Sequence, residues 1–176
     1  MTVRRSWPRF ALECLVVLGL LVGAGTWVGS RYRLGVVGRV ACLPGRLYLY
    51  RLTAAAPARG EQVVFRTDGR TFPHFGVGSL FLKQVAGVPG DEVEIDAAGR
   101  VVITGPQGYR WQAALEDEVL RRLGRPRESF AARYRIPPDS YFVMGTRPGT
   151  FDSRYWGLVR REQLRGKVVW VLAGYE

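Results

Sequence analysis

The sequence is poor in three residue types that carry chemistry: lysine, cysteine and histidine. Of its 26 basic residues two are lysine, Lys83 and Lys167, so the other 24 are arginine. One histidine and two cysteines leave no cluster of ligands with zinc spacing, so we expect no metal and no organic cofactor. Cys14 lies inside a long apolar run and Cys42 well beyond it, which argues against a disulfide framework.

The scarcity of lysine makes Lys83 conspicuous. Arginine stays protonated at any useful pH, whereas a desolvated lysine can lose its proton and act as a base. Lys83 lies in the apolar stretch 81–88, which ends in the turn Pro89-Gly90-Asp91. A charged and unpaired ammonium there would cost free energy. The pattern indicates a general base. An edge-strand lysine whose amine reaches water is the alternative.

The net charge of +11 raises the question of nucleic acid. The sequence has no zinc-finger spacing, no RNP-like aromatic strand and no helix-turn-helix pattern. Its arginines are scattered, with small clusters at 121–122, 125–127 and 160–161. Attraction to anionic lipid headgroups is the simpler interpretation. We therefore expect membrane lipid as a partner and no nucleic acid.

A long apolar run near the N-terminus predicts a membrane anchor. Residues 10–28 contain one charge, Glu13, and match the ~20 residues that a helix needs to cross a bilayer. A cleaved secretory signal is the rival, because the run follows a basic segment, residues 1–9. The run is long for such a signal and lacks a small-residue cleavage site, which favours an uncleaved anchor. Three arginines on each side leave its orientation open.

The remaining 140 or so residues allow one domain with a real core. One helix is predicted at 111–123, because residues 111, 115, 119 and 123 share a face and Gly124 and Pro126 follow. Short strands are predicted at 47–50, 62–65, 80–85, 92–95, 101–103, 140–144 and 167–172. A Gly-rich aromatic loop spans 72–80. The pattern favours a mainly β fold on a membrane stalk.

Four sequence boxes occur in an order that resembles the type I signal peptidases, serine proteases with a Ser–Lys dyad. They are Cys42-Leu43-Pro44-Gly45, Arg59-Gly60-Glu61-Gln62-Val63-Val64-Phe65, Lys83-Gln84-Val85-Ala86-Gly87-Val88-Pro89-Gly90-Asp91 and the segment from Gly145 to Gly157. The resemblance covers roughly residues 38–95 and 138–172. It implies a signal-peptidase-like β catalytic core with one N-terminal transmembrane helix. The catalytic domain would span 33–176, with a small helical insertion at 96–139.

The nucleophile box points to a branch of this family. Proline follows Cys42 by two positions, and the Leu47-Tyr48 pair comes next, similar to the TraF-type conjugative-transfer peptidases. That branch implies leader cleavage of a prepilin on the extracytoplasmic or periplasmic side of the bacterial inner membrane, by a single-pass protein. A housekeeping signal peptidase acting on many preproteins is the alternative.

The resemblance assigns roles to named residues. Cys42 stands at the position of the nucleophilic serine, and a thiol is the more acidic and better nucleophile. Lys83 would be its general base. Thr150, Asp152, Ser153 and Arg154 would support the site, with Thr150 orienting the lysine. Leu43, Pro44 and Val85 would line a shallow cleft for small substrate residues.

Two departures from the family pattern leave alternatives open. Val40 stands where the family often has a hydroxyl that helps to bind the oxyanion. With cysteine as nucleophile, the protein is either a Cys–Lys peptidase or a catalytically impaired member that acts in pilus assembly. His74, the only histidine, offers a rival Cys42–His74 dyad, although its neighbours Phe72, Pro73 and Phe75 suit contact with lipid or substrate.

Overall fold

A computed structural model describes residues 6–36 and 42–172. The chain divides into two compact units, one up to Arg33 and one from Leu34 onward, and each is described by itself. The helices are α1 (Trp7–Arg31), α2 (Asp117–Leu123) and α3 (Ser153–Trp156). Short 3₁₀ turns lie at η1 (Gly69–Thr71), η2 (Pro106–Gly108), η3 (Arg127–Phe130) and η4 (Arg161–Gln163).

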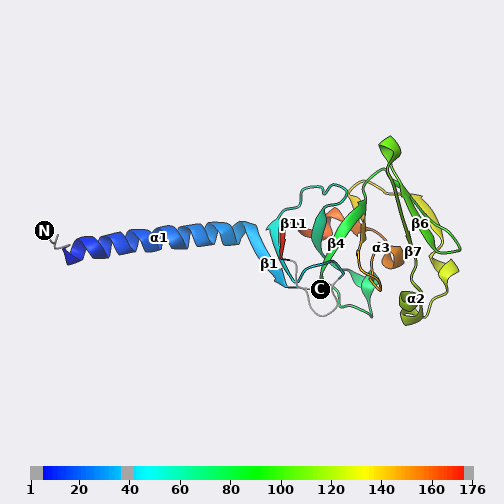
Figure 1. The fold of residues 1–176 in the computed structure, drawn as a ribbon, viewed down its shortest axis with the longest axis horizontal. Coiled ribbons are helices and arrows are strands. Elements are labelled where there is room, and N and C mark those ends of the chain that lie inside the picture. The colour runs from blue at the N-terminus through cyan, green and yellow to red at the C-terminus, as the bar shows by residue number, and fades with distance from the viewer. Residues whose placement is uncertain (1–5, 37–41, 173–176) are drawn as a thin grey trace. The chain divides into compact units, whose positions relative to one another are not determined.

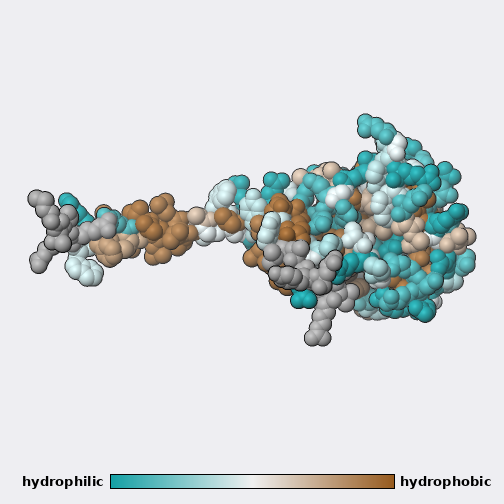
Figure 2. Space-filling model, viewed as in Figure 1, coloured by the Kyte–Doolittle hydropathy of each residue, from teal (hydrophilic) through white to brown (hydrophobic). Residues whose placement is uncertain are grey.

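The first unit is dominated by the apolar helix α1. Pro8 lies in its first turn, where the missing amide hydrogen costs no hydrogen bond, and Arg31 is in its last turn. A helix of 25 residues is about 37 Å long, against a hydrocarbon thickness of about 30 Å. Hydrophobic side chains cover much of it (Figure 2). In length and composition α1 therefore fits a membrane-spanning helix, and it contains the predicted run 10–28.

The second unit is built on two antiparallel sheets (Figure 1). The larger has the order β1-β2-β11-β3-β4-β9-β10. Its strands are β1 (Tyr32–Val36), β2 (Leu47–Leu52), β3 (Gln62–Arg66), β4 (Leu80–Gly87), β9 (Ser140–Met144), β10 (Val159–Arg160) and β11 (Leu164–Leu172). The long β11 pairs with both β2 and β3, so it joins the segment after Cys42 to the centre of the sheet.

The smaller sheet has the order β7-β6-β5-β8. Its strands are β5 (Glu92–Ile95), β6 (Arg100–Thr104), β7 (Arg110–Ala114) and β8 (Ala132–Arg135). Along β5, buried Val93 and Ile95 alternate with exposed Glu92 and Glu94, as expected of a sheet with one solvated face. The hairpin between β5 and β6 turns at Gly99, whose φ of 78° suits glycine.

One hydrophobic core joins the two sheets. Its members come from both, and α3 and the start of α2 pack against them. Fully buried residues include Phe65 and Val85 of the larger sheet and Val93, Val101 and Ile103 of the smaller sheet. The mainly β fold predicted from the sequence is confirmed, and each predicted strand is present within a few residues of its expected bounds.

The helix predicted at 111–123 is wrong in its first part. Residues Arg110–Ala114 form β7, in which Trp111 and Ala113 turn inward at a period of two and pair with Ile103 and Val101 of β6. The ladder with β6 supplies hydrogen-bond partners for the backbone of this segment. The helix begins at Asp117 and ends at Leu123, and the left-handed φ of 62° at the following Gly124 confirms the predicted stop.

Candidate active site

Cys42 lies in the segment that leads into β2, and backbone contacts fix its position. Its carbonyl oxygen accepts hydrogen bonds from the amides of Thr146 at 2.9 Å and Arg147 at 3.4 Å. The hydroxyl of Tyr48 donates to the carbonyls of Pro44 and Gly45, which closes the loop after Cys42. Burial raises the pKa of Tyr48, Arg147 offsets part of this, and Cys42 adds to the rise. The half-buried thiol therefore lies on a braced loop.

Lys83 is the most unusual buried residue of the domain. It lies on β4, between β3 and β9, so the edge-strand alternative is wrong. Its exposure is 0%, and among the described residues its Nζ has no hydrogen-bond partner. The nearest aromatic ring is that of Phe81, with its centroid 5.8 Å from Nζ. A charged amine here would have lost its water without a compensating hydrogen bond.

Cys42 and Lys83 line one groove of about 740 Å³. Most of its other lining is apolar or aromatic: Leu34, Val36, Leu43, Tyr48, Tyr50, Val64, Phe75, Leu80, Phe81, Leu82, Val119, Leu123 and Phe151. The structure thus places the two predicted catalytic residues at the same cleft although they are 41 positions apart in the sequence. An apolar groove with a thiol and an amine on its wall suits nucleophilic attack on a bound peptide.

The three residues predicted to bind substrate have different surroundings. Leu43 is 1% exposed and lines the groove. Pro44 is exposed and does not belong to its lining. Val85 is buried in the hydrophobic core, where it pairs with Val143 of β9, and it is likewise absent from the lining. Successive side chains of a strand point to opposite faces, so Val85 points into the core and Gln84 to the other face. The sequence around Val85 is largely apolar and did not show which way it faces.

Asp152 and Arg154, two of the predicted supporting residues, form a buried ion pair to which neighbouring groups are hydrogen-bonded. The carboxylate of Asp152 accepts from Nε of Arg154 at 2.8 Å and from Nη2 at 2.9 Å. It also accepts from the amide of Gly145 at 3.1 Å and from the hydroxyl of Thr150 at 3.0 Å. Burial by itself lowers the pKa of Arg154, but Asp152 more than offsets this and the pKa is raised. The pair braces the loop 145–152 beside Cys42.

The hydroxyl groups of Thr150 and Ser153 form hydrogen bonds that hold the local structure together. The hydroxyl of Thr150 donates to Asp152 and accepts from Arg154 at 3.0 Å, whereas Nζ of Lys83 has no hydrogen-bond partner in the described chain. The hydroxyl of Ser153 accepts from the amide of Val143 at 2.9 Å and joins α3 to β9. The lysine-orienting role that the resemblance gives to Thr150 is therefore absent from this geometry.

Sequence reasoning missed Glu116, which connects the insertion to the loop 145–152. Its carboxylate accepts from the amide of Gly149 and pairs with Nη2 of Arg154 at 2.9 Å. Nη1 of Arg154 also donates to the carbonyl of Ala114 at 2.7 Å. The sequence predicted a helix over 111–123, and no sequence signal marked Glu116 as a partner for a buried arginine.

His74 lies on the same groove and stays a candidate base. Its ring meets that of Phe151 edge to face, with centroids 5.7 Å apart. The residue is exposed, in contrast to Lys83. Both cysteines are free. Val40, the predicted oxyanion departure, lies outside the described residues.

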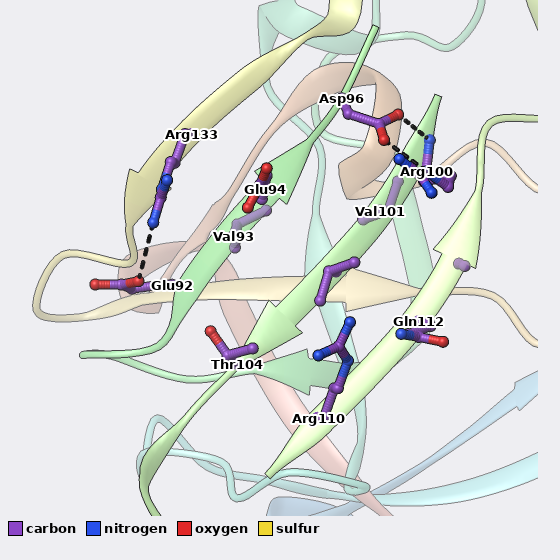
Figure 3. Close-up of a pocket in the computed structure, with 12 residues that line it drawn as sticks. Glu92, Val93, Glu94, Asp96, Arg100, Val101, Thr104, Arg110, Gln112 and Arg133 are labelled. Carbon is purple, nitrogen blue, oxygen red and sulfur yellow. Dashed lines mark hydrogen bonds and ion pairs between the residues drawn. The ribbon is translucent and has the colours of Figure 1, made fainter. Parts of the chain in front are cut away.

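A second hollow lies on the solvated face of the smaller sheet and has a different character (Figure 3). Glu92 and Glu94 of β5, Arg100 of β6, Arg110 of β7 and Arg133 of β8 project over it. Opposite charges meet there, as in the contacts of Asp96 with Arg100 at 2.6 Å and of Glu92 with Arg133 at 4.0 Å. It shares no lining residue with the groove of Cys42. Neither Cys42 nor Lys83 belongs to the lining of this second hollow.

The sequence matches the family described as "Signal peptidase, peptidase S26" over residues 10–173. The chain belongs to this signal peptidase family. The match runs through both boxes that supply Cys42 and Lys83 and through the anchor helix. The family assignment agrees with the groove, because a signal peptidase needs a nucleophile and a base at one extended cleft.

Several signal peptidases are similar to this one. The Probable signal peptidase I-2 of Synechocystis sp. is 35% identical over 113 residues, 63% of this chain and 46% of that protein. The Signal peptidase I of Leptolyngbya laminosa is 30% identical over 115 residues, 64% of this chain and 51% of that protein. The chain thus matches about half the length of these curated relatives. A crystal structure of a signal peptidase I from Enterococcus faecalis V583 is 24% identical, covers 69% of this chain and all of that one, and gives a TM-score of 0.38.

Proposed function

We propose that this chain is a membrane-anchored signal peptidase that removes leader peptides from secreted preproteins with Cys42 as nucleophile and Lys83 as general base. The observation that carries the proposal is the common groove: a half-buried thiol and a fully buried amine without a hydrogen-bond partner lie on its wall. Placement of a nucleophile and a base at one cleft is the geometry that covalent peptide hydrolysis requires.

The reaction follows from these two groups. The thiol of Cys42 attacks the scissile carbonyl carbon while its proton passes to the amine of Lys83. The tetrahedral intermediate breaks its C–N bond, and the new N-terminus of the mature protein leaves with the proton from Lys83. Water then attacks the thioester while Lys83 accepts its proton. The C–S bond breaks, and the thiolate of Cys42 takes that proton from Lys83 as the leader is released.

We place the enzyme in the bacterial inner membrane as a single-pass protein, with the domain 33–176 on the extracytoplasmic side. Helix α1 supports this placement because it is long and apolar enough to span the bilayer. The domain would contact lipid through exposed large apolar side chains such as Phe72, Val77 and Trp170. Such a surface would hold the groove near precursors that are themselves still in the membrane.

For the precursor itself we propose a prepilin of the conjugative type. The short nucleophile box supports it, since Tyr48 closes the loop of Cys42 through Pro44 and Gly45 in a way that depends on the spacing of that box. A general preprotein, as the names of the relatives suggest, is the second candidate.

The test is cleavage by the full-length protein in detergent, with a conjugative prepilin and a general preprotein as substrates. We expect Cys42→Ser to retain cleavage at a lower rate and Cys42→Ala to abolish it. N-ethylmaleimide should inhibit a Cys14→Ala protein and leave its Cys42→Ser derivative active. If Cys42→Ala cleaves as fast as the parent, the proposal fails. Faster cleavage of the general preprotein than of the prepilin would decide against the prepilin.

A further inference from the structure

The insertion supplies part of the wall of the groove that Cys42 and Lys83 line. Val119 and Leu123 of the short helix α2 line it, together with Phe151 and Phe75. Val119 is 2% exposed and Leu123 is half-buried. Helix α2 lies beside the smaller sheet in Figure 1, and its inner face reaches the catalytic groove of the larger one. The insertion therefore contributes directly to the cleft in which a peptide would lie.

A row of aromatic rings joins this wall to the catalytic amine. The ring of Phe81, near Nζ of Lys83, meets that of Phe75 edge to face at 4.8 Å. Phe75 in turn stacks on Phe151 at 5.9 Å. A continuous row of three aromatic rings thus runs from Lys83 to Phe151. His74, against Phe151, and Arg122 of α2 are polar residues that also line this groove.

Helix α2 is held against the catalytic loop by hydrogen bonds on both sides of Gly149. Nη2 of Arg122 donates to the carbonyl of Gly149 at 3.0 Å. Glu116, just before the helix, accepts from the amide of Gly149 and pairs with the buried Arg154. The position of Leu123 relative to the loop is therefore fixed by the same ion pair that braces the catalytic site.

We propose that this end of the groove is a subsite for one large apolar side chain of the precursor, and that Leu123 determines its specificity. The proposal rests on the proposed function. A peptide whose scissile carbonyl reaches Cys42 must run along the groove in an extended form, at about 3.3 Å per residue. A side chain a few residues from the cut then meets Val119, Leu123 and Phe151. Small residues next to the cut would lie instead at the cleft beside Leu43.

The first experiment measures alkylation of Cys42 and does not depend on proteolysis. The full-length Cys14→Ala protein in detergent is treated with N-ethylmaleimide and with N-hexylmaleimide, and the ratio of the two rates is followed by mass spectrometry. Each methylene group of the reagent that is buried in the groove can raise the alkylation rate by up to about fourfold. We expect the hexyl reagent to be favoured at least tenfold. Leu123→Trp, which fills the subsite, should bring the ratio close to that of a free thiol in the same detergent.

Two further variants make this result specific. Leu123→Ser keeps the space and removes the apolar surface, so it should lower the ratio even if tryptophan distorts the helix. Arg121→Trp adds the same bulk on the exposed side of α2 and should leave the ratio unchanged. An unchanged ratio in both Leu123 variants would overturn the subsite, as would a ratio that falls equally in Arg121→Trp.

The second experiment uses a cleaved precursor in which each of the four positions on either side of the cut is in turn leucine or alanine. We expect one position to prefer leucine with the parent enzyme, to lose that preference with Leu123→Trp and to keep it with Arg121→Trp. If every position keeps its preference, the subsite is wrong while the proposed function stands. If no precursor is cleaved at all, the proposed function fails and the alkylation ratio still tests the pocket.

Discussion

The carbonyl oxygen of Cys42 accepts a hydrogen bond from the amide of Thr146 at 2.9 Å, which joins two boxes more than 100 positions apart in the sequence. The segment of the nucleophile and the loop 145–152 are thereby held together. Since that loop also carries Asp152, the ion-pair partner of the buried Arg154, substitutions in this pair should alter the position of Cys42.

Loss of the buried carboxylate should destabilise the domain strongly. Asp152→Ala leaves the guanidinium of Arg154 buried without its main partner, and breaking such a pair costs roughly 3–5 kcal/mol. The free energy of unfolding in urea measures it. The control is Glu162→Gln, which removes the exposed pair with Arg160 and should change stability by less than about 1 kcal/mol. Equal effects of the two variants would contradict the role of Asp152.

Tyr48 should affect the position of Cys42 more than the stability of the fold. Tyr48→Phe removes the donor to the carbonyls of Pro44 and Gly45 and loosens the loop that carries the nucleophile. We expect a lower kcat for precursor cleavage, and a loss of about 1–3 kcal/mol in stability at most. Tyr50→Phe, two residues further along the same face of β2, is the matched control. A kcat that falls more in Tyr50→Phe than in Tyr48→Phe would refute this role.

Glu116 should matter although it lies outside every family box. Glu116→Ala frees the amide of Gly149 and removes a partner of Arg154, so we expect a loss of about 1–3 kcal/mol and slower cleavage. Glu118→Ala removes only an exposed contact with Arg122 at 3.4 Å and is the control for thermal unfolding. Comparable unfolding temperatures for the two variants would show that the bridge from the insertion is unimportant.

The free energy of unfolding should fall at alkaline pH, and ionisation of Tyr134 should contribute to this fall. Burial raises the pKa of Tyr134 to about 12, from 10.0. The folded state therefore keeps the phenol proton between pH 10 and about 12, where the unfolded chain loses it. This contribution to stability is complete below pH 10 and declines as the pH rises through that interval. Urea unfolding at stepped pH should show a shallower decline for Tyr134→Phe, and an identical decline would contradict the assignment.

The sequence predicted the strands better than it predicted the contacts between distant segments. Lys83 was proposed as a base from its rarity and its apolar neighbours, and the strands predicted at 92–95 and 140–144 are β5 and β9. Residues 111–114 were misassigned because the same apolar spacing suits a helix or an inward-facing strand, and only pairing with β6 decides between them. Glu116 and Leu123 could not be found in this way, since their roles arise from contacts between distant segments.

The central claim is tested most directly by the chain's two lysines. Lys83→Met replaces a buried amine that has no hydrogen-bond partner in the described structure, so it should not lower the free energy of unfolding. Lys167→Met removes contacts with Glu61 at 2.7 Å and with the carbonyl of Ala56, away from the groove. We predict that precursor cleavage falls roughly 10²–10⁴-fold in Lys83→Met and stays within a few-fold of the parent in Lys167→Met. A folded Lys83→Met protein that cleaves at the parental rate would contradict the account.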